Sequence, residues 1–193
     1  VKVSHIRSDR GDQATIKAKL RDLLSVESGY GSAMYKSVGP FMNLAKSKLG
    51  ELRGKMVVVL DFSEYVNATE GLFRYADGFN DGVCASMSDA NLTVCDMYAN
   101  TDSFCEMRRD QLTKWEGNAV LGSGRLFLLS WTLTSTPVLS KTIEDLAEDA
   151  NRRLPGVLRE QYKRVGSGRM PNIVYVDFLN SETAQEIVKY NFE

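Results

Sequence analysis

One segment restricts the possible folds more than any other. Met56–Phe62 reads MVVVLDF, which is nearly all apolar and rich in valine. A run without alternation of apolar and polar residues is typical of a strand that is buried on both faces of a parallel sheet. The sequence therefore predicts a parallel strand here, covered on both sides.

Further apolar runs of strand length are separated by stretches with helical spacing of their apolar residues. Strands are expected at Val1–Ile6, Met56–Phe62, Leu92–Met97, Leu126–Trp131 and Ile173–Leu179. Helices are expected at Asp12–Leu24, Asp102–Trp115, Lys141–Tyr162 and Ser181–Tyr190. Pro155 is expected to break the third helix or to start a second one, and Ser181 suits an N-cap. Alternating strands and helices predict parallel βαβ units in an α/β fold.

The five expected strands fit two architectures. An open, doubly wound sheet can be built from five strands, whereas a closed (β/α)8 barrel needs eight strands and typically ~250 residues. The chain has 193 residues, enough for one domain with a real core. Periodicity alone does not choose between the two.

The composition excludes some classes of function. The net charge is -1, so the chain lacks the electrostatic footprint of a nucleic-acid-binding protein. No run approaches the ~18 apolar residues of a spanning helix. Residue 1 is Val1 rather than a methionine, so we expect the natural N-terminus, and any signal peptide, to lie upstream.

Three cysteines, Cys84, Cys95 and Cys105, lie near two glycosylation sequons that begin at Asn67 and Asn91. Together they favour a secreted glycoprotein in an oxidising compartment, although three buried thiols in a cytosolic protein would also fit. Because the cysteine count is odd, one thiol is free or pairs outside the chain. A disulfide is expected between Cys84 and Cys105, since Cys95 lies in an apolar strand and should be packed.

A family resemblance begins at Leu49–Lys55, which reads LGELRGK and precedes the apolar run at Met56. This pattern resembles the LG(D/E)xRGK segment and following strand of the phosphatidylinositol-specific phospholipases C. Other segments match that family in its order and roughly at its spacing. They are Val1–Ile6, Val94–Tyr98 (VCDMY), Arg125–Thr134 (RLFLLSWTLT), Asn151–Leu154 (NRRL) and Pro171–Asn180 (PNIVYVDFLN).

The resemblance implies that residues 1–193 are a single domain forming the C-terminal part, about five βα units, of a (β/α)8 barrel. In that family two histidines carry out the acid–base chemistry, one of them in a His-Asp-Ser segment. This sequence has one histidine, His5, and no such segment. We therefore expect the N-terminal βα units, with both catalytic histidines, to be missing from the chain.

Three residues carry the family's site most directly. Asp177 matches the aspartate that holds and orients a catalytic histidine, a role that resembles the aspartate of a catalytic triad. Asp96 and Tyr98 match residues that bind inositol, because a carboxylate accepts hydrogen bonds from hydroxyls and an aromatic ring covers the sugar face. The structural alternatives are a helix N-cap or loop-facing acid at Asp177, a strand-end acid at Asp96 and a core tyrosine at Tyr98.

Two further candidates depart from the family pattern. Asp61 stands where bacterial members carry an inositol-contacting arginine, so it reverses the charge while still being able to bind hydroxyls. His5, with Arg7 as a competing match, falls near a substrate-contacting lysine of bacterial members; a structural histidine is the alternative. We expect the carboxylates of Asp61, Asp96 and Asp177 to converge at the C-terminal ends of three parallel strands.

The implied protein is a phosphoric diester hydrolase that cleaves a glycerophosphoinositol phosphodiester at a membrane surface. It is expected to be a secreted monomer with a phospholipid head group as partner, no nucleic acid, no metal site in this chain and no cofactor; calcium would enter only through ligands in the missing part. Two alternative functions remain: a catalytically inactive, barrel-derived binding protein, and a self-standing five-stranded α/β binding domain.

Trp131 is expected in the core, and Trp115 at a packed helix end or, alternatively, at a lipid interface.

Overall fold

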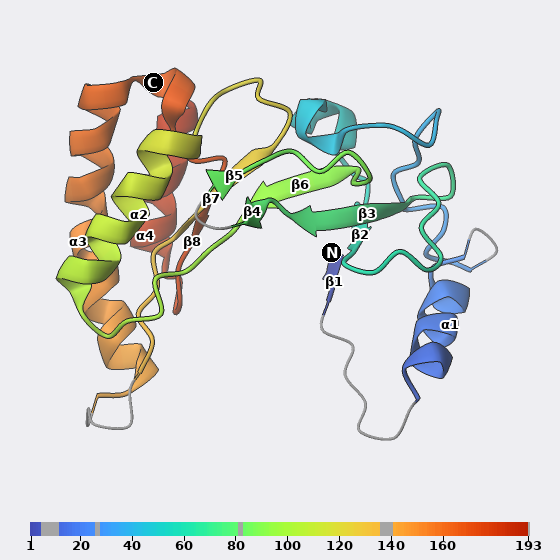
Figure 1. Ribbon diagram of the computed structural model, residues 1–193, viewed down its shortest axis with the longest axis horizontal. Helices are drawn as coiled ribbons and strands as arrows, with labels where there is room; N and C mark the ends of the chain where they lie inside the picture. The colour runs from blue at the N-terminus through green and yellow to red at the C-terminus, as the bar shows by residue number, and fades with distance from the viewer. Residues whose placement is uncertain (5–11, 26–27, 81–82, 136–140, 193) are drawn as a thin grey trace. The chain divides into compact units, whose positions relative to one another are not determined.

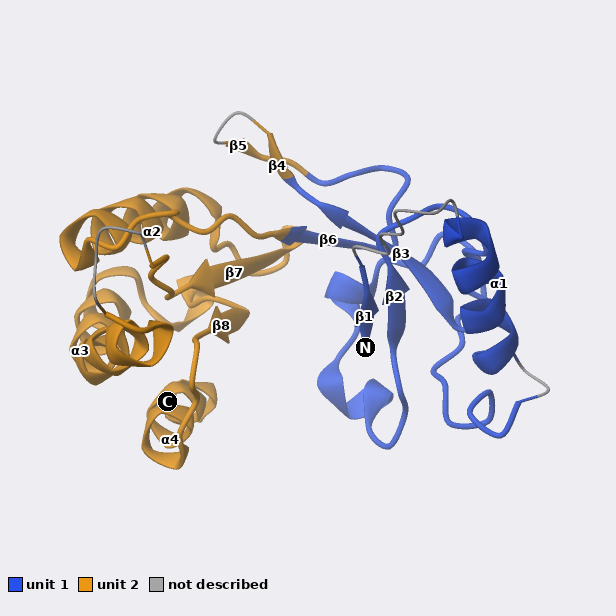
Figure 2. Cartoon of the chain, turned by 90° about the horizontal axis from the view of Figure 1, so that it is seen from below, with its two compact units in different colours: residues 1–78, 86–94 blue, residues 79–85, 95–193 orange. Residues whose placement is uncertain are grey.

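The computed structural model describes residues 1–4, 12–25, 28–80, 83–135 and 141–192. These residues form two compact units. Unit 1 comprises residues 1–78 and 86–94, and unit 2 comprises residues 79–85 and 95–193 (Figure 2). His5 and Arg7 lie outside the described residues, so the roles expected for them stay predictions.

Unit 1 is built on parallel strands. Their order is β1 (Lys2–Val3), β2 (Val58–Leu60), β3 (Leu72–Asp77) and β6 (Leu92–Cys95), the last of which ends at the boundary with unit 2. Each neighbouring pair runs parallel, with Val58 opposite Leu72 and Tyr75 opposite Leu92. All residues of β2 are buried, as its apolar run predicts.

Side-chain alternation divides the sheet of unit 1 into two faces. Val58, Leu60 and Leu72 pack with Met34 into one hydrophobic cluster. Val59 and Phe73 are paired neighbours on the opposite face. Helix α1 (Gln13–Leu23) and short 3-10 turns at Leu44–Lys46 and Leu49–Leu52 complete the unit.

Unit 2 combines two parallel strands with three helices. The strands are β7 (Leu126–Ser130) and β8 (Ile173–Tyr175), and the helices are α2 (Phe104–Asn118), α3 (Ile143–Val165) and α4 (Ser181–Val188). Short 3-10 turns lie at Ser167–Arg169 and Lys189–Asn191. Strands β4 (Phe79–Asn80) and β5 (Val83–Cys84) form an antiparallel hairpin. The helices gather on one side of β7 and β8 (Figure 1). Phe127, Leu129 and Trp131 face them and form the core with Leu154 and Leu158 of α3.

Both tryptophans are buried in this core. The indole N–H of Trp131 donates to the carbonyl of Ala150 at 2.8 Å, and that of Trp115 donates to the carbonyl of Arg169 at 2.6 Å. The packed position expected for Trp115 is confirmed, whereas its contact with a lipid interface is contradicted by its complete burial.

The expected α/β fold is confirmed, but the number of strands was too small. Parallel strands occur inside all five expected segments, and β3 is an additional one.

Helix α3 continues through Pro155 without a break. Proline in a helix interior costs about 3 kcal/mol, which the buried face of α3, including Leu146, Ala150 and Leu154, can offset. The N-cap of α4 is Asn180 rather than Ser181, since the Asn180 side chain accepts from the Thr183 N–H at 2.8 Å.

The expected Cys84–Cys105 disulfide is wrong. Cys84 bonds Cys95, with 5.7 Å between their Cα atoms, and Cys105 is a free, exposed thiol. Cys95 is packed in the core as expected, but the β4–β5 hairpin also buries Cys84 in that cluster. Burial of Cys95 therefore accompanies pairing instead of preventing it.

The sequon at Asn91 is buried. Asn91 is 7% exposed, and its amide donates to the carbonyls of Pro40 and Met42 at 2.9 and 3.0 Å. Its side-chain oxygen accepts from the Arg74 N–H at 2.9 Å. A glycan on this nitrogen is incompatible with the fold. Among the described helices, none combines the length and the apolar character needed to cross a bilayer.

Candidate functional site

The candidate site residues follow the C-terminal ends of parallel strands. Asp61 comes directly after β2 in unit 1. In unit 2, Asp96 comes directly after β6, and Asp177 lies two residues beyond β8. Barrel enzymes build their sites at this end of the strands. Because Asp61 belongs to the other unit, convergence of all three carboxylates stays a prediction.

The segment after β6 presents alternate residues to opposite sides. Cys95 packs in the core beneath the helices, so Asp96 is directed to the face away from them. Asp96 is half-buried, and Tyr98 is 57% exposed. The alternative of a core tyrosine at Tyr98 is therefore wrong, and its ring is accessible to a ligand.

The segment after β8 follows the same rule. Val174 and Val176 pack against the core, which directs Tyr175 and the half-buried Asp177 to the face away from the helices. The Asp177 carbonyl accepts a hydrogen bond from the Asn151 amide of α3 at 2.9 Å. Asp177 is not the N-cap of α4, which removes one alternative for this residue. The backbone of Asp177 is thus held just beyond a strand end, and its carboxylate does not cap the helix.

Three loops after strand ends contain strained backbone. Among the described residues, the non-glycine residues with positive φ are Tyr65 (65°), Asn100 (51°) and Phe178 (51°). They follow β2, β6 and β8, the strands that precede Asp61, Asp96 and Asp177. Such residues cost of order 1–3 kcal/mol each and concentrate at functional sites. The strain therefore supports this edge of each unit as the functional one.

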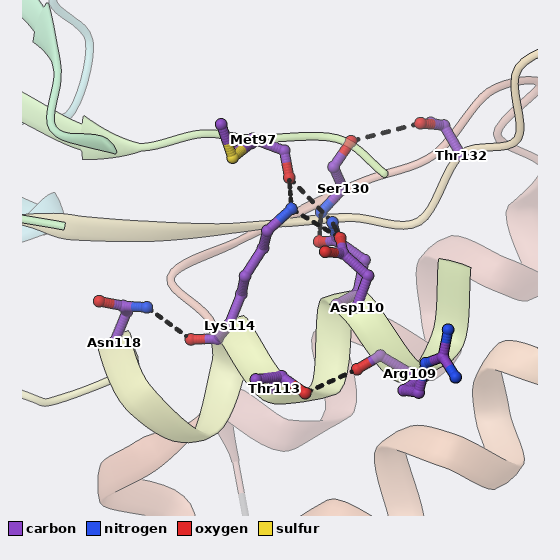
Figure 3. Close-up of polar contacts among 9 residues, drawn as sticks. Met97, Arg109, Asp110, Thr113, Lys114, Asn118, Ser130 and Thr132 are labelled. Carbon is purple, nitrogen blue, oxygen red and sulfur yellow. Dashed lines mark hydrogen bonds and ion pairs between the residues drawn. The ribbon is translucent and has the colours of Figure 1, made fainter. Parts of the chain in front are cut away.

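A partly buried polar network holds the segment after β6 (Figure 3). The carbonyl of Met97 accepts from the Gln111 amide at 2.9 Å and from the Lys114 ammonium at 3.0 Å. Lys114 also forms an ion pair with Asp110 at 2.6 Å. The Ser130 hydroxyl at the end of β7 lies 3.3 Å from the Thr132 hydroxyl. The sequence reasoning missed this network, since Gln111 lies in a helix with a thin apolar stripe.

A groove of about 410 Å³ lies between α3 and the loop that carries Asp177. Its walls combine polar and apolar surface and include Glu148 and Asn151 of α3 and Phe178 and Asn180 of the loop. The described residues include no group of three or more His, Cys, Asp and Glu side chains arranged to hold a metal ion.

Sequence reasoning also missed Asp77, the last residue of β3. Because β2 and β3 run parallel, Asp77 at the end of β3 lies at the same strand-end edge of unit 1 as Asp61. Asp77 pairs with Val94 and, by alternation, shares a face of the sheet with Phe73 and Tyr75. On that face the Lys2 ammonium sits 3.8 Å from the centre of the Tyr75 ring. The signal was present in Leu72–Asp77 (LFRYAD), where apolar and aromatic residues have strand propensity.

No protein-family model matches the sequence, and no curated protein matches it. The structure is similar to that of a phosphatidylinositol-specific phospholipase C from Listeria monocytogenes, with a TM-score of 0.60 and 17% sequence identity. The match covers 98% of this chain and 62% of that chain. The chain thus spans less than two thirds of the protein it matches. This likeness shows an α/β fold of that kind over nearly the whole chain.

Proposed function

We propose that this chain is part of a phosphodiesterase barrel that cleaves a glycerophosphoinositol phosphodiester. The observation that carries the proposal is the similarity, over 98% of the chain, to a phosphatidylinositol-specific phospholipase C. The positions of Asp96 and Asp177 after the ends of parallel strands support it, since barrel enzymes place their chemistry there.

In this proposal Asp96 and Tyr98 bind the inositol ring. The Asp96 carboxylate accepts hydrogen bonds from adjacent hydroxyls, and the exposed Tyr98 ring lies against the apolar face of the sugar. Asp61 and His5 are proposed as further substrate contacts, with Asp61 replacing the positive charge of bacterial members by a hydroxyl-binding carboxylate.

Asp177 acts differently, through a histidine that it holds in one tautomer and whose imidazolium it stabilises. The 2-hydroxyl oxygen of inositol attacks the phosphorus, and the bond from phosphorus to the diacylglycerol oxygen breaks. One histidine takes the hydroxyl proton and another protonates the departing oxygen. A single histidine cannot occupy both sides of the phosphorus, and this sequence contains one. The acid–base pair is therefore proposed to lie outside residues 1–193.

The setting proposed for this protein is outside the cell, at a phospholipid surface. The Cys84–Cys95 disulfide supports an oxidising compartment, because such bonds are rare in reducing ones.

The single histidine also favours a second candidate, a barrel-derived binding protein without activity. Such a protein would use Asp96 and Tyr98 to hold a head group without cleaving it. The two candidates agree on binding and differ only in turnover.

The test is release of inositol phosphate from phosphatidylinositol micelles by the natural full-length protein and by residues 1–193, side by side. We expect turnover by the natural protein only, and an Asp177→Asn variant with kcat lowered about 10²–10⁴-fold, the range of a lost proton-transfer contribution. Head-group binding without turnover would favour the binding protein. Turnover by residues 1–193 that is abolished by His5→Ala would overturn the account and assign catalysis to His5.

A further inference from the structure

The backbone that carries Asp96 and Tyr98 has no strand of its own. Strand β6 ends at Cys95, and residues 96–100 have no regular secondary structure. The segment is fastened at both ends, by the Cys84–Cys95 disulfide and by a hydrogen bond from the Thr134 N–H to the Thr101 carbonyl at 2.9 Å. Its middle therefore needs another support.

Gln111 of α2 supplies that support. Its side chain is 0% exposed, and its amide donates to the Met97 carbonyl at 2.9 Å. Its side-chain oxygen accepts a hydrogen bond at 3.0 Å from the N–H of Ser130, which is the last residue of β7. One side chain thus joins the segment after β6 to the end of β7, in the place of a backbone-to-backbone hydrogen bond.

Lys114 strengthens the same point. Its ammonium group donates to the Met97 carbonyl at 3.0 Å and to the Asp110 carboxylate at 2.6 Å. The Lys114 side chain is 12% exposed, and a hydrogen bond from a charged donor is stronger than one between neutral groups. Asp110 also accepts from the Gln111 amide at 3.0 Å, which fixes the amide orientation.

We propose that Gln111, assisted by Lys114, is a positioning residue that sets the orientation of Asp96 and Tyr98. Asp96 and Tyr98 are the two chain neighbours of Met97. A Met97 carbonyl that is held in place restrains the backbone on both sides of it, and with it the carboxylate of Asp96 and the ring of Tyr98. The positioning role stands on the geometry alone, whereas its effect on ligand affinity rests on the proposed function.

The variant Gln111→Met tests the role, because it keeps the volume of the side chain and removes its hydrogen bonds with Met97, Ser130 and Asp110. The matched control is Gln161→Met. Gln161 is also buried, in α3 of the same unit, but its oxygen accepts a local hydrogen bond, from Arg164 of the same helix at 3.1 Å. Both variants are compared by circular dichroism to establish that they are folded.

The first readout is the NMR order parameter of the backbone amides of residues 97–99, which requires no ligand and reports how rigidly the segment is held. We expect it to fall from about 0.85, the value of rigid backbone, to below about 0.6 in Gln111→Met and to stay at the parent value in Gln161→Met. Unchanged order parameters of residues 97–99 in folded Gln111→Met would overturn the proposal. If Gln111→Met does not fold, Lys114→Met decides, because it removes one donor to Met97 and leaves Gln111 in place; a smaller fall is expected there, and no fall would overturn the proposal.

The second readout is the dissociation constant for myo-inositol 1-phosphate, measured by calorimetry. We expect it to rise at least tenfold in Gln111→Met and to stay within twofold in Gln161→Met, a difference that a general loss of packing would not produce. Lower order parameters with unchanged affinity would overturn the role in ligand binding. If the parent chain does not bind this ligand, the proposed function fails, while the order parameters still decide whether Gln111 positions the segment.

Discussion

Asn91 illustrates how one buried amide can stabilise a loop far away in sequence. It links the start of β6 to Pro40 and Met42 and to the backbone of Arg74 in β3. Asn91→Ala would leave buried polar groups without partners, at about 1–3 kcal/mol for each. We expect urea unfolding to show a loss of about 3 kcal/mol. Asn67→Ala is the control, since the Asn67 side-chain oxygen accepts from the N–H and the hydroxyl of nearby Thr69; equal losses in both variants would contradict this reading.

The same burial predicts which sequon is used. Produced through a secretory pathway, folded protein should carry a glycan at Asn67 and none at Asn91, whose amide nitrogen makes two hydrogen bonds. Mass spectrometry of glycopeptides before and after enzymatic deglycosylation measures the occupancy of each site. A folded fraction glycosylated at Asn91 would show that the hydrogen bonds to Pro40 and Met42 are dispensable.

Asp145 provides a pH-dependent contribution at the start of α3. Hydrogen bonds from the backbone and then the side chain of Thr142 lower the pKa of its carboxyl below the usual aspartate value. A depressed pKa means that the stabilisation is fully present above the unfolded pKa and is lost as the pH falls through the folded one. Asp145→Asn should therefore remove part of the acid sensitivity of the protein. The melting temperatures of the parent protein and of Asp145→Asn, measured between neutral and acidic pH, test this expectation. If both melting temperatures fall equally as the pH is lowered, Asp145 makes no such contribution.

At the scale of elements, the β4–β5 hairpin depends on its disulfide. Its strands have two residues each, so few backbone hydrogen bonds hold it. The Cys84–Cys95 bond closes a loop with a sequence separation of 11, and loss of such a bond costs roughly 3 kcal/mol in the chain-entropy description. Cys84→Ser/Cys95→Ser should lower the melting temperature, and Cys105→Ser should not, because Cys105 is exposed and unpaired.

The elements that the sequence predicted well are those with a strong local pattern. The buried strand β2 follows from an uninterrupted apolar run, and α1 to α4 follow from helical spacing. Strand β3 was missed because Arg74 and Asp77 interrupt its apolar pattern, although its neighbours bury Phe73 and Tyr75. Pro155 was misread because the long-range packing of α3 outweighs a local preference.

At the scale of the whole molecule, the sequence matches no family model. Its α/β fold was nevertheless indicated by a few short segments that resemble a known family, and the similarity to a solved structure agrees with it. The positions of Asp96 and Asp177 after strand ends were predictable, since order along the chain determines them. The pairing of Cys84 with Cys95 and the support of Met97 by Gln111 were not, because both depend on contacts between segments that no local pattern encodes.

The central claim is that Asp96 contacts an inositol head group while Asp177 acts through a histidine. Calorimetric titration of residues 1–193 with myo-inositol 1-phosphate tests this most directly. The account predicts saturable binding to one site, at least tenfold weaker in Asp96→Asn, because a hydrogen bond to a charged acceptor contributes about 1.5–3 kcal/mol. It predicts an affinity within twofold of the parent in Asp177→Asn. Absence of saturable binding, or equal weakening in both variants, would contradict it.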